Sequence, residues 1–252
     1  MSRSFDELID EASTVSINAW DFSWLDGRAL EERPTWRYFD RVAERATGAS
    51  RLLDIDTGVG NLIADLPRLP PLTVGIEAYP PSIERAWPRL RARGAHLVQT
   101  TPGDLRLPFA PRSFDLITSR HPIATSWTEI ARVLAPGGRY LSQQVGPRSL
   151  QDLSEFLMGP LPQGSKRDPA QARTAAEAAG LIVDQLLTER PKTVFYDIGA
   201  VVYFLRLVVW IVPGFTVERY RDRLRALHDQ IEHAGPFETT ASRYLIDARS
   251  PA

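Results

Sequence analysis

The ten residues Leu52–Asn61, LLDIDTGVGN, are the stretch that most clearly indicates the fold of this chain. The apolar residues around Asp54 are typical of a buried strand, and Gly58 and Gly60 follow in a loop. Glycines at that place let a ligand approach the backbone and the start of the next helix. A carboxylate, Asp56, stands where such loops usually carry their first glycine. The stretch therefore predicts a ligand-binding turn with one unusual residue.

Short apolar runs alternate with helix-like segments on both sides of this loop. The alternation predicts an α/β fold with a doubly wound, mostly parallel, seven-stranded sheet and helices on both faces. The predicted strands are residues 51–55, 73–77, 96–100, 115–119, 140–145, 181–187 and 242–248. The predicted helices are residues 4–12, 35–47, 60–66, 82–93, 126–134, 149–158, 169–179, 197–212 and 216–233.

The first 50 residues differ from the rest because their helical stretches flank an aromatic link, WDFSWLDGR. We expect a helical cap or lid over residues 1–50 and a main domain over residues 51–252. A helical insertion at about residues 197–234 is large enough to build a substrate wall. The aromatic candidates to close over a substrate or a cation are Trp20, Phe22, Trp24 and Tyr203. The alternative is ordinary packing, in which the first three dock a terminal helix and the last belongs to a core.

Composition restricts the function and the location of the protein. The 252 residues include 30 lysines and arginines and 31 acidic residues, so the net charge does not favour binding to DNA, RNA or anionic lipid. The absence of cysteine excludes disulfides, a thiolate nucleophile and cysteine-ligated metal centres, and we predict no metal site. The most apolar run, residues 200–212, is shorter than the ~20 residues that span a bilayer. Since acids replace the apolar core of a signal peptide near the N-terminus, we expect a cytoplasmic protein.

Acidic residues follow three of the predicted strands, namely Asp54, Glu77 and Asp104. In an open α/β sheet, ligands lie beyond the carboxyl ends of the strands, so these side chains are candidates to contact one ligand. A pyrophosphate would be repelled by Asp54 and Asp56, because like charges repel strongly in a partly desolvated pocket. A positively charged ligand that carries hydroxyl groups suits this edge better.

On these residues the sequence resembles the class I S-adenosylmethionine-dependent methyltransferases. The opening strand and loop match the family's first motif except at Asp56, and the acid in VGIEAYPP matches its ribose-binding acid. The stretch GDLRLPFAPRSFDLI resembles the third and fourth motifs, and EIARVLAPGGRYL is similar to the helix, turn and fifth strand of the family. The similarity is close over about residues 50–146, and the flanking segments look like a bacterial branch of the superfamily.

The resemblance implies a Rossmann-like methyltransferase fold, S-adenosylmethionine as cofactor, and methyl transfer as reaction. It assigns ribose binding to Glu77 and adenine binding to Asp104. The implied cofactor-binding residues are Asp54, Asp56, Gly58, Gly60, Glu77, Ala78, Asp104 and Leu105. Simpler interpretations exist, because Asp54 can cap the loop and Asp104 in Pro-Gly-Asp is a good turn residue.

Asp56 is compatible with a functional loop. Among residues that have a side chain, asparagine and aspartate adopt positive φ most readily, so Asp56 can keep the turn at a cost of ~1 kcal/mol relative to glycine. Its carboxylate is also a candidate to face the sulfonium or the amino group of the cofactor. We expect the loop to bind, with an altered affinity.

Arg120 and His121, which follow the fourth strand, are the candidate catalytic residues. A neutral imidazole at that place can take a proton from an acceptor hydroxyl or ammonium group, and Arg120 can either anchor a substrate carboxylate or pair with an acid of the lid. The alternative for His121 is a structural role before Pro122. A general base is optional, because positioning supplies much of the acceleration in an in-line displacement.

The acceptor is expected to be a small molecule that is methylated at oxygen or nitrogen. The turn SRHP lacks the Asn/Asp-Pro-Pro-Tyr sequence of enzymes that methylate adenine or glutamine nitrogens, and no thiol is present to attack a pyrimidine. Two alternatives remain. Some ribosomal RNA guanine methyltransferases look similar around VLAPGGRYL but carry a cysteine-rich zinc module that is absent here, and some proteins of this fold bind the cofactor without transferring methyl. The sequence also leaves a homodimer open.

Overall fold

The structure is a computed structural model of the chain and describes residues 3–17, 21–162 and 167–252. The chain divides into two compact units. Unit one comprises Met1–Arg33, Pro147–Ser165 and Arg190–Ser242, and unit two comprises Pro34–Gly146, Lys166–Glu189 and Arg243–Ala252. No helix within the described ranges is both long and apolar enough to cross a bilayer.

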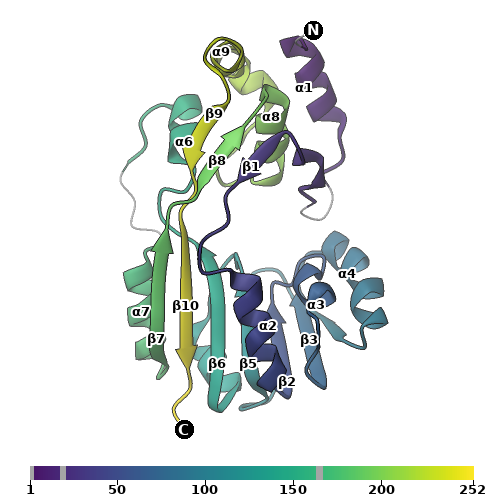
Figure 1. Cartoon of the computed structure of the whole chain (residues 1–252), viewed down its shortest axis with the longest axis vertical. Coiled ribbons are helices and arrows are strands. Elements are labelled where there is room, and N and C mark those ends of the chain that lie inside the picture. Colours follow the sequence, from purple (N-terminus) through teal and green to yellow (C-terminus); the bar gives the residue numbers. More distant parts are fainter. Residues whose placement is uncertain (1–2, 18–20, 163–166) are drawn as a thin grey trace. The chain divides into compact units, whose positions relative to one another are not determined.

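Unit two contains the predicted seven-stranded sheet, with the order β4-β3-β2-β5-β6-β10-β7 (Figure 1). All pairs from β4 to β6 are parallel, whereas β10 is antiparallel to both β6 and β7. This confirms the predicted fold class. The strands are β2 Arg51–Ile55, β3 Leu72–Glu77, β4 His96–Gln99, β5 Phe114–Arg120, β6 Leu134–Val145, β7 Ile182–Glu189 and β10 Arg243–Arg249.

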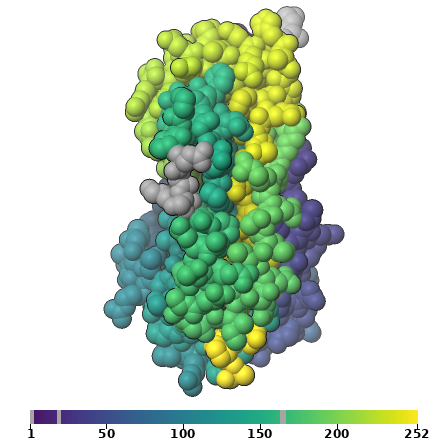
Figure 2. All heavy atoms as spheres, turned by 90° about the vertical axis from the view of Figure 1, so that its left-hand side faces the viewer, coloured from purple at the N-terminus to yellow at the C-terminus, as the bar shows by residue number. Residues whose placement is uncertain are grey.

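Helices cover both faces of this sheet, because neighbouring residues of each strand point to opposite sides. Leu52, Leu116 and Leu141 pack against Val42 of α2 on one face. On the other face, the adjacent residues of the same strands contribute to a core with α5 and α7. Figure 2 shows α7 and β7, in green, making up much of one side of unit two. The helices of unit two are α2 Tyr38–Gly48, α3 Asn61–Asp65, α4 Pro80–Ala92, α5 Trp127–Val133 and α7 Pro169–Ala178.

Unit one combines helices with a small antiparallel sheet of order β1-β8-β9. Its core is formed largely by α8, in which eight of the ten residues are buried. The elements of unit one are α1 Phe5–Thr14, the 3-10 helix η2 Ser23–Leu25, β1 Ala29–Glu31, α6 Gln151–Met158, β8 Lys192–Phe195, α8 Ile198–Leu207, α9 Val217–Ala234 and β9 Phe237–Thr240.

The division between the units differs from the predicted boundary at residue 50. Helix α2 belongs to unit two because Tyr38, Val42 and Ala46 are buried against the large sheet. The insertion before the last strand is longer than residues 197–234, since β8 and β9 flank its two helices, and β8 pairs with both β9 and β1. Residues 3–33 therefore fold with this insertion rather than as a separate cap.

Candidate functional site

The loop after β2 is a tight turn built on three positive φ angles. Asp56 has φ of 54°, Gly58 of 59° and Gly60 of 77°. The backbone N–H of Thr57 donates to the carbonyl of Ile76 (3.0 Å), and the N–H of Gly60 donates to the carbonyl of Thr57 (3.0 Å). Asp56 thus adopts the left-handed conformation expected from the sequence, and it keeps the turn that a glycine would make.

The two glycines of the loop serve different purposes. A Cβ atom on Gly60 would lie 2.1 Å from Cδ1 of Leu90, so Gly60 permits close packing of the loop on α4. A Cβ atom on Gly58 would meet no described atom within 4 Å, so the space beside that backbone is open. Gly60 is needed for packing, whereas Gly58 leaves room for a ligand.

Glu77, at the end of β3, organises the turn through its carboxylate. Oε2 accepts a hydrogen bond from the N–H of Gly58 (2.7 Å), and Oε1 accepts from the N–H groups of Ala78 (2.8 Å) and Tyr79 (2.9 Å). A carboxylate has about four acceptor positions, so one remains for a hydroxyl group of a ligand. Glu77 is only 9% exposed.

Asp54 and Asp56 bring further negative charge to the same loop. Burial raises the pKa of Asp54 to about 6, although the hydroxyl of Thr118 donates to it (2.7 Å) and favours the charged form. Burial also raises the pKa of Asp56, against a hydrogen bond from the N–H of Ile123 (3.1 Å), and the charge of Glu77 adds to the rise. The structure therefore brings Asp54, Asp56 and Glu77 together in a poorly solvated place, which favours a positively charged ligand.

Asp104 and Leu105 lie on the loop after β4, and both are exposed. The carboxylate of Asp104 accepts from the N–H of Arg106 (2.9 Å). This hydrogen bond is typical of an aspartate that stabilises a turn, which is the alternative to adenine binding for this residue. The loop continues toward α5, where the carboxylate of Glu129 accepts from the N–H of Leu107 (2.8 Å). Asp104 is thus exposed, unlike Asp54 and Glu77, which are buried, and the cofactor role of Asp104 and Leu105 stays a prediction.

His121 follows β5 with a φ of 55°. Its backbone N–H donates to the carbonyl of Gln143 (2.7 Å), and its Nε2 lies 3.0 Å from Nε2 of the same glutamine. Burial, together with the positive charges of Arg243, Arg120 and Arg167, holds the pKa of His121 well below its usual value. Gln143 was not predicted as a site residue, because nothing in its sequence context distinguishes it from other strand residues.

A cavity of about 270 Å³ begins immediately after His121. Within it, the hydroxyl of Tyr244 donates to Oε1 of Gln144 (2.5 Å). The lining residues are Pro122, Ile123, Ala124, Thr125, Trp127, Gln144, Val145, Arg167, Asp168, Gln171, Ala172 and Tyr244. No sequence motif indicates this cavity, because its walls combine residues 122–127 with residues of β6, β10 and the start of α7, which are distant along the chain.

The predicted lid aromatics belong to unit one, except that Trp20 lies outside the described residues. Trp24 packs on Tyr203 with ring centroids 4.8 Å apart, and the guanidinium of Arg28 lies 3.7 Å from the centroid of the Trp24 ring. The Tyr203 hydroxyl donates to the carbonyl of Asp21 (2.6 Å). Phe22 is 40% exposed. Trp24 and Tyr203 thus anchor the aromatic link within unit one, as their alternative interpretation states, and a role in substrate binding stays a prediction.

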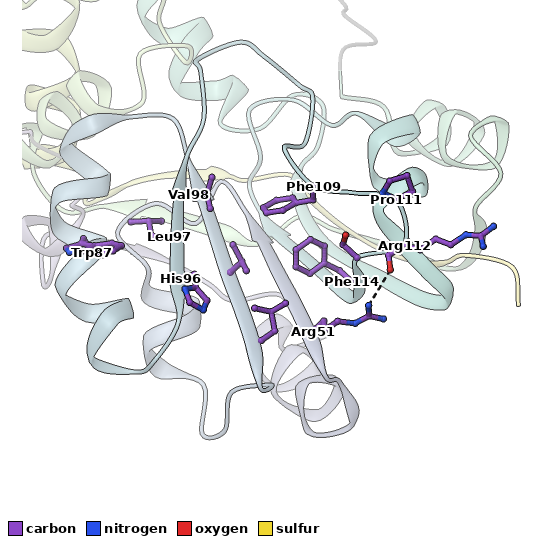
Figure 3. Close-up of a pocket in the computed structure, with 12 residues that line it drawn as sticks. Arg51, Trp87, His96, Leu97, Val98, Phe109, Pro111, Arg112 and Phe114 are labelled. Carbon is purple, nitrogen blue, oxygen red and sulfur yellow. Dashed lines mark hydrogen bonds between the residues drawn. The ribbon is translucent and has the colours of Figure 1, made fainter.

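A larger hollow of about 740 Å³ lies away from the carboxylates. Figure 3 shows Phe109 and Phe114 on one side of it and Trp87 and His96 on the other. Its lining includes Arg51, the first residue of β2, and Phe114, the first residue of β5. The hollow therefore reaches the amino ends of the strands, the edge opposite to the one at which α/β folds bind ligands. Its larger volume does not make it the candidate site.

Comparisons with known proteins identify a domain and a fold. Residues 53–142 match the model of a family described as a methyltransferase domain. Among curated protein sequences, none matches the chain significantly.

Three solved structures illustrate the fold similarity. A candidate methyltransferase from Bacillus halodurans is 16% identical, with a TM-score of 0.59, and the match covers 85% of this chain and 99% of that chain. The (4+2)-cyclase SpnF is 18% identical, with a TM-score of 0.54, and coverage is 98% and 92%. Phosphoethanolamine N-methyltransferase 2 from Haemonchus contortus, in complex with phosphomonomethylethanolamine and S-adenosylhomocysteine, is 16% identical, with a TM-score of 0.56, and coverage is 100% and 61%. At these identities the similarity shows a shared fold.

Proposed function

We propose that this chain, whose residues 53–142 match a methyltransferase domain, transfers the methyl group of S-adenosylmethionine to an oxygen or nitrogen atom of a small molecule. Cofactor-dependent methyl transfer follows from the methyltransferase domain at residues 53–142. The class of the acceptor is our proposal, and the cavity beside His121 is the observation that carries it.

The residues of the β2 loop fit S-adenosylmethionine. Asp54 and Asp56 provide negative charge for a ligand that carries a sulfonium and an ammonium group. Glu77 keeps one acceptor position for a ribose hydroxyl after it has bound three backbone N–H groups. The open space beside Gly58 is what a ligand lying against the backbone requires. Ala78, Asp104 and Leu105 complete the set that we assign to the cofactor by resemblance.

The cavity after His121 supports a small acceptor. Its volume of about 270 Å³ is slightly below the ~300 Å³ at which pockets for drug-sized ligands begin, which suits a small acceptor, and polar side chains line it together with aromatic ones. It is connected to the cofactor loop, because one of its lining residues, Ile123, donates its N–H to Asp56. The balanced net charge of the chain also does not favour a nucleic-acid substrate.

Bound S-adenosylmethionine would supply an electrophilic methyl group on a positively charged sulfur atom. The residues of the chain would hold the reactants in line, because positioning converts a bimolecular reaction into a nearly intramolecular one. We assign anchoring of an anionic group of the acceptor to Arg120, whose side chain is exposed beside His121.

Labelling tests the class of acceptor. The protein is incubated with S-adenosylmethionine carrying a labelled methyl group, together with either a small-molecule extract or total RNA from the same cells. We expect label in the small-molecule fraction. Label in RNA alone would overturn the proposal in favour of an RNA methyltransferase. Label in neither fraction, with cofactor binding intact, would favour a protein that binds the cofactor without transferring methyl. The cyclase SpnF shares this fold, and its name denotes a reaction other than methyl transfer.

A pair of variants links this activity to the cavity. Ala124→Trp places a large side chain in the lining and should reduce labelling at least about tenfold, which corresponds to ~1.4 kcal/mol, without abolishing cofactor binding. Ala170→Trp, on an exposed position of α7 outside the lining, is the control and should label as the wild type does. Equal labelling by both variants would place the acceptor elsewhere.

A further inference from the structure

Two buried side chains outside the predicted site hold the ring of His121. The Nε1–H of Trp36 donates to Oε1 of Gln143 (2.8 Å), and these side chains are 5% and 6% exposed. An indole N–H can only donate, so it fixes the amide oxygen of Gln143 toward Trp36 and the amide nitrogen on the other side. That nitrogen lies 3.0 Å from Nε2 of His121.

The orientation of Gln143 determines where His121 carries its proton. An amide NH₂ group donates only, so Nε2 of His121 must accept with its lone pair. A neutral imidazole then has its proton on Nδ1. The main chain supports the arrangement, because the N–H of His121 donates to the carbonyl of the same Gln143 (2.7 Å). Both the backbone and the ring of His121 are therefore held by one residue of β6.

A second proton on the ring is disfavoured. It would place an Nε2–H group directly against the NH₂ group of Gln143. His121 is also half-buried and faces three positive charges, those of Arg243 at the start of β10, Arg120 at the end of β5 and Arg167 before α7. Burial and these charges together lower the pKa of His121 well below the usual range, so the ring is neutral at pH 7.

We infer that Trp36 and Gln143 are positioning residues that hold His121 as the neutral Nδ1–H tautomer, so that His121 donates a hydrogen bond to an oxygen atom of the acceptor instead of taking its proton. This replaces the general-base role expected from the sequence. The acceptor molecule would accordingly carry a carbonyl, carboxylate or hydroxyl oxygen near the methylated atom. A proton released by methylation of a hydroxyl or amine would pass to water. The role toward the acceptor rests on the proposed function, whereas the tautomer is a property of the chain alone.

Nuclear magnetic resonance of the ¹⁵N-labelled full chain without ligand tests the tautomer. Long-range ¹H–¹⁵N correlations distinguish Nδ1–H, Nε2–H and doubly protonated rings, and the spectrum of His121→Asn assigns one of the four histidines to position 121. We expect the Nδ1–H pattern and a titration midpoint well below the ordinary histidine value of about 6.5. An Nε2–H pattern, or a ring that titrates near its usual pH, would overturn the inference.

Two variants test the control exerted by Gln143 and Trp36. Gln143→Glu replaces the donating NH₂ group by a second acceptor oxygen, so the proton should move to Nε2 and the titration midpoint of His121 should rise by about 1 to 3 pH units. Trp36→Phe removes the indole donor, so the amide can turn and both tautomers should appear. Gln185→Glu, which makes the same change at an exposed residue of β7 that bonds Arg41 rather than His121, should leave the His121 pattern unchanged.

The outcomes are separable from those of the labelling experiment. The spectra need no cofactor and no acceptor, so they decide the tautomer even if the methyl acceptor is not a small molecule. An unchanged His121 signal in both Gln143→Glu and Trp36→Phe would show that these residues do not set the tautomer. If either variant fails to fold, the wild-type spectrum alone still decides whether Nδ1 carries the proton.

Discussion

At the scale of single residues, the site is a set of carboxylates held where water is scarce. Asp54 is 3% exposed, and its ordinary pKa of 3.8 is raised to about 6, mainly by burial. A raised carboxylate pKa means that the folded state binds the proton more tightly than the unfolded state does. The stability of the protein without ligand therefore declines as the pH rises from about 3.8 to about 6. A bound cation would offset this cost.

Replacing Asp54 by asparagine should stabilise the ligand-free protein and weaken cofactor binding. Asparagine keeps an acceptor for Thr118 and has no charge to desolvate. A pKa difference of about two units corresponds to ~3 kcal/mol, so we expect a gain of roughly 1 to 3 kcal/mol in the free energy of unfolding at pH 8 and a smaller gain at pH 4.5. Urea denaturation at the two pH values measures the difference.

The control for this prediction is Asp65→Asn, because the side chain of Asp65 is 63% exposed. It should change stability by less than ~0.5 kcal/mol at either pH. A loss of stability at pH 8 in Asp54→Asn, or a gain that does not depend on pH, would show that burial of the charge is not the controlling factor.

The chemistry of some site residues could be read from the sequence, and that of others could not. The positive φ of Asp56 follows from the conformational preference of aspartate, and the structure confirms it. The association of Glu77 with the loop follows from the meeting of parallel strand ends. The roles of Trp36 and Gln143 depend on which atoms of distant side chains meet, and residue spacing does not contain that information.

At the scale of elements, the turn between β2 and α3 depends on two glycines for separate reasons. Gly60 lies against Leu90 of α4, and Gly58 lies beside open space. Both have positive φ, so the backbone strain of an alanine is similar at the two positions and only the surroundings of the new methyl group differ. Substitutions at the two glycines of this turn therefore separate the effect of packing on stability from the effect of ligand space on affinity.

Alanine at these positions should separate stability from affinity. Gly60→Ala forces its methyl group into Leu90 and should cost roughly 2 to 4 kcal/mol of stability, from overpacking and positive φ together. Gly58→Ala should cost only ~1 kcal/mol of stability but should weaken binding of S-adenosylhomocysteine more than about tenfold, because its methyl group enters the ligand space. Denaturation curves and calorimetric titration measure the two effects.

Gly94→Ala provides the matched control. Gly94 follows α4, has φ of 73°, and likewise has no described atom within 4 Å of an added Cβ. Its alanine variant should show a strain cost similar to that of Gly58→Ala and wild-type affinity. Equal affinity in the Gly58 and Gly94 variants would contradict the assignment of Gly58 to the ligand.

The elements that could be predicted are those whose signal is local. The strands of the large sheet are short apolar runs bounded by glycine, proline or charged residues, so the sequence predicts all seven of them. Strands β1, β8 and β9 have three or four residues each, and their partners are distant in sequence: β1 pairs with β8 across more than 150 positions, and β8 pairs with β9 across the two helices of the insertion. A window of neighbouring residues carries no sign of such pairing.

At the scale of the whole molecule, the chain builds two units, and the candidate site lies in unit two. The antiparallel β10 between β6 and β7 returns the C-terminal segment to the large sheet, and its Tyr244 contributes to the cavity. The sequence-based boundary at residue 50 differs from the division into two units, because helix α2 is amphipathic in the same way whether it caps a domain or covers a sheet. Only its buried contacts with the sheet strands decide between these alternatives.

The central claim is that the carboxylate-lined loop of unit two binds S-adenosylmethionine. Calorimetric titration of the stable product analogue S-adenosylhomocysteine into the wild-type protein tests it most directly. We predict saturable binding to one site per chain that is weakened in Gly58→Ala and retained in Gly94→Ala. No measurable binding to the folded wild-type protein at any pH from 6 to 8 would contradict the claim.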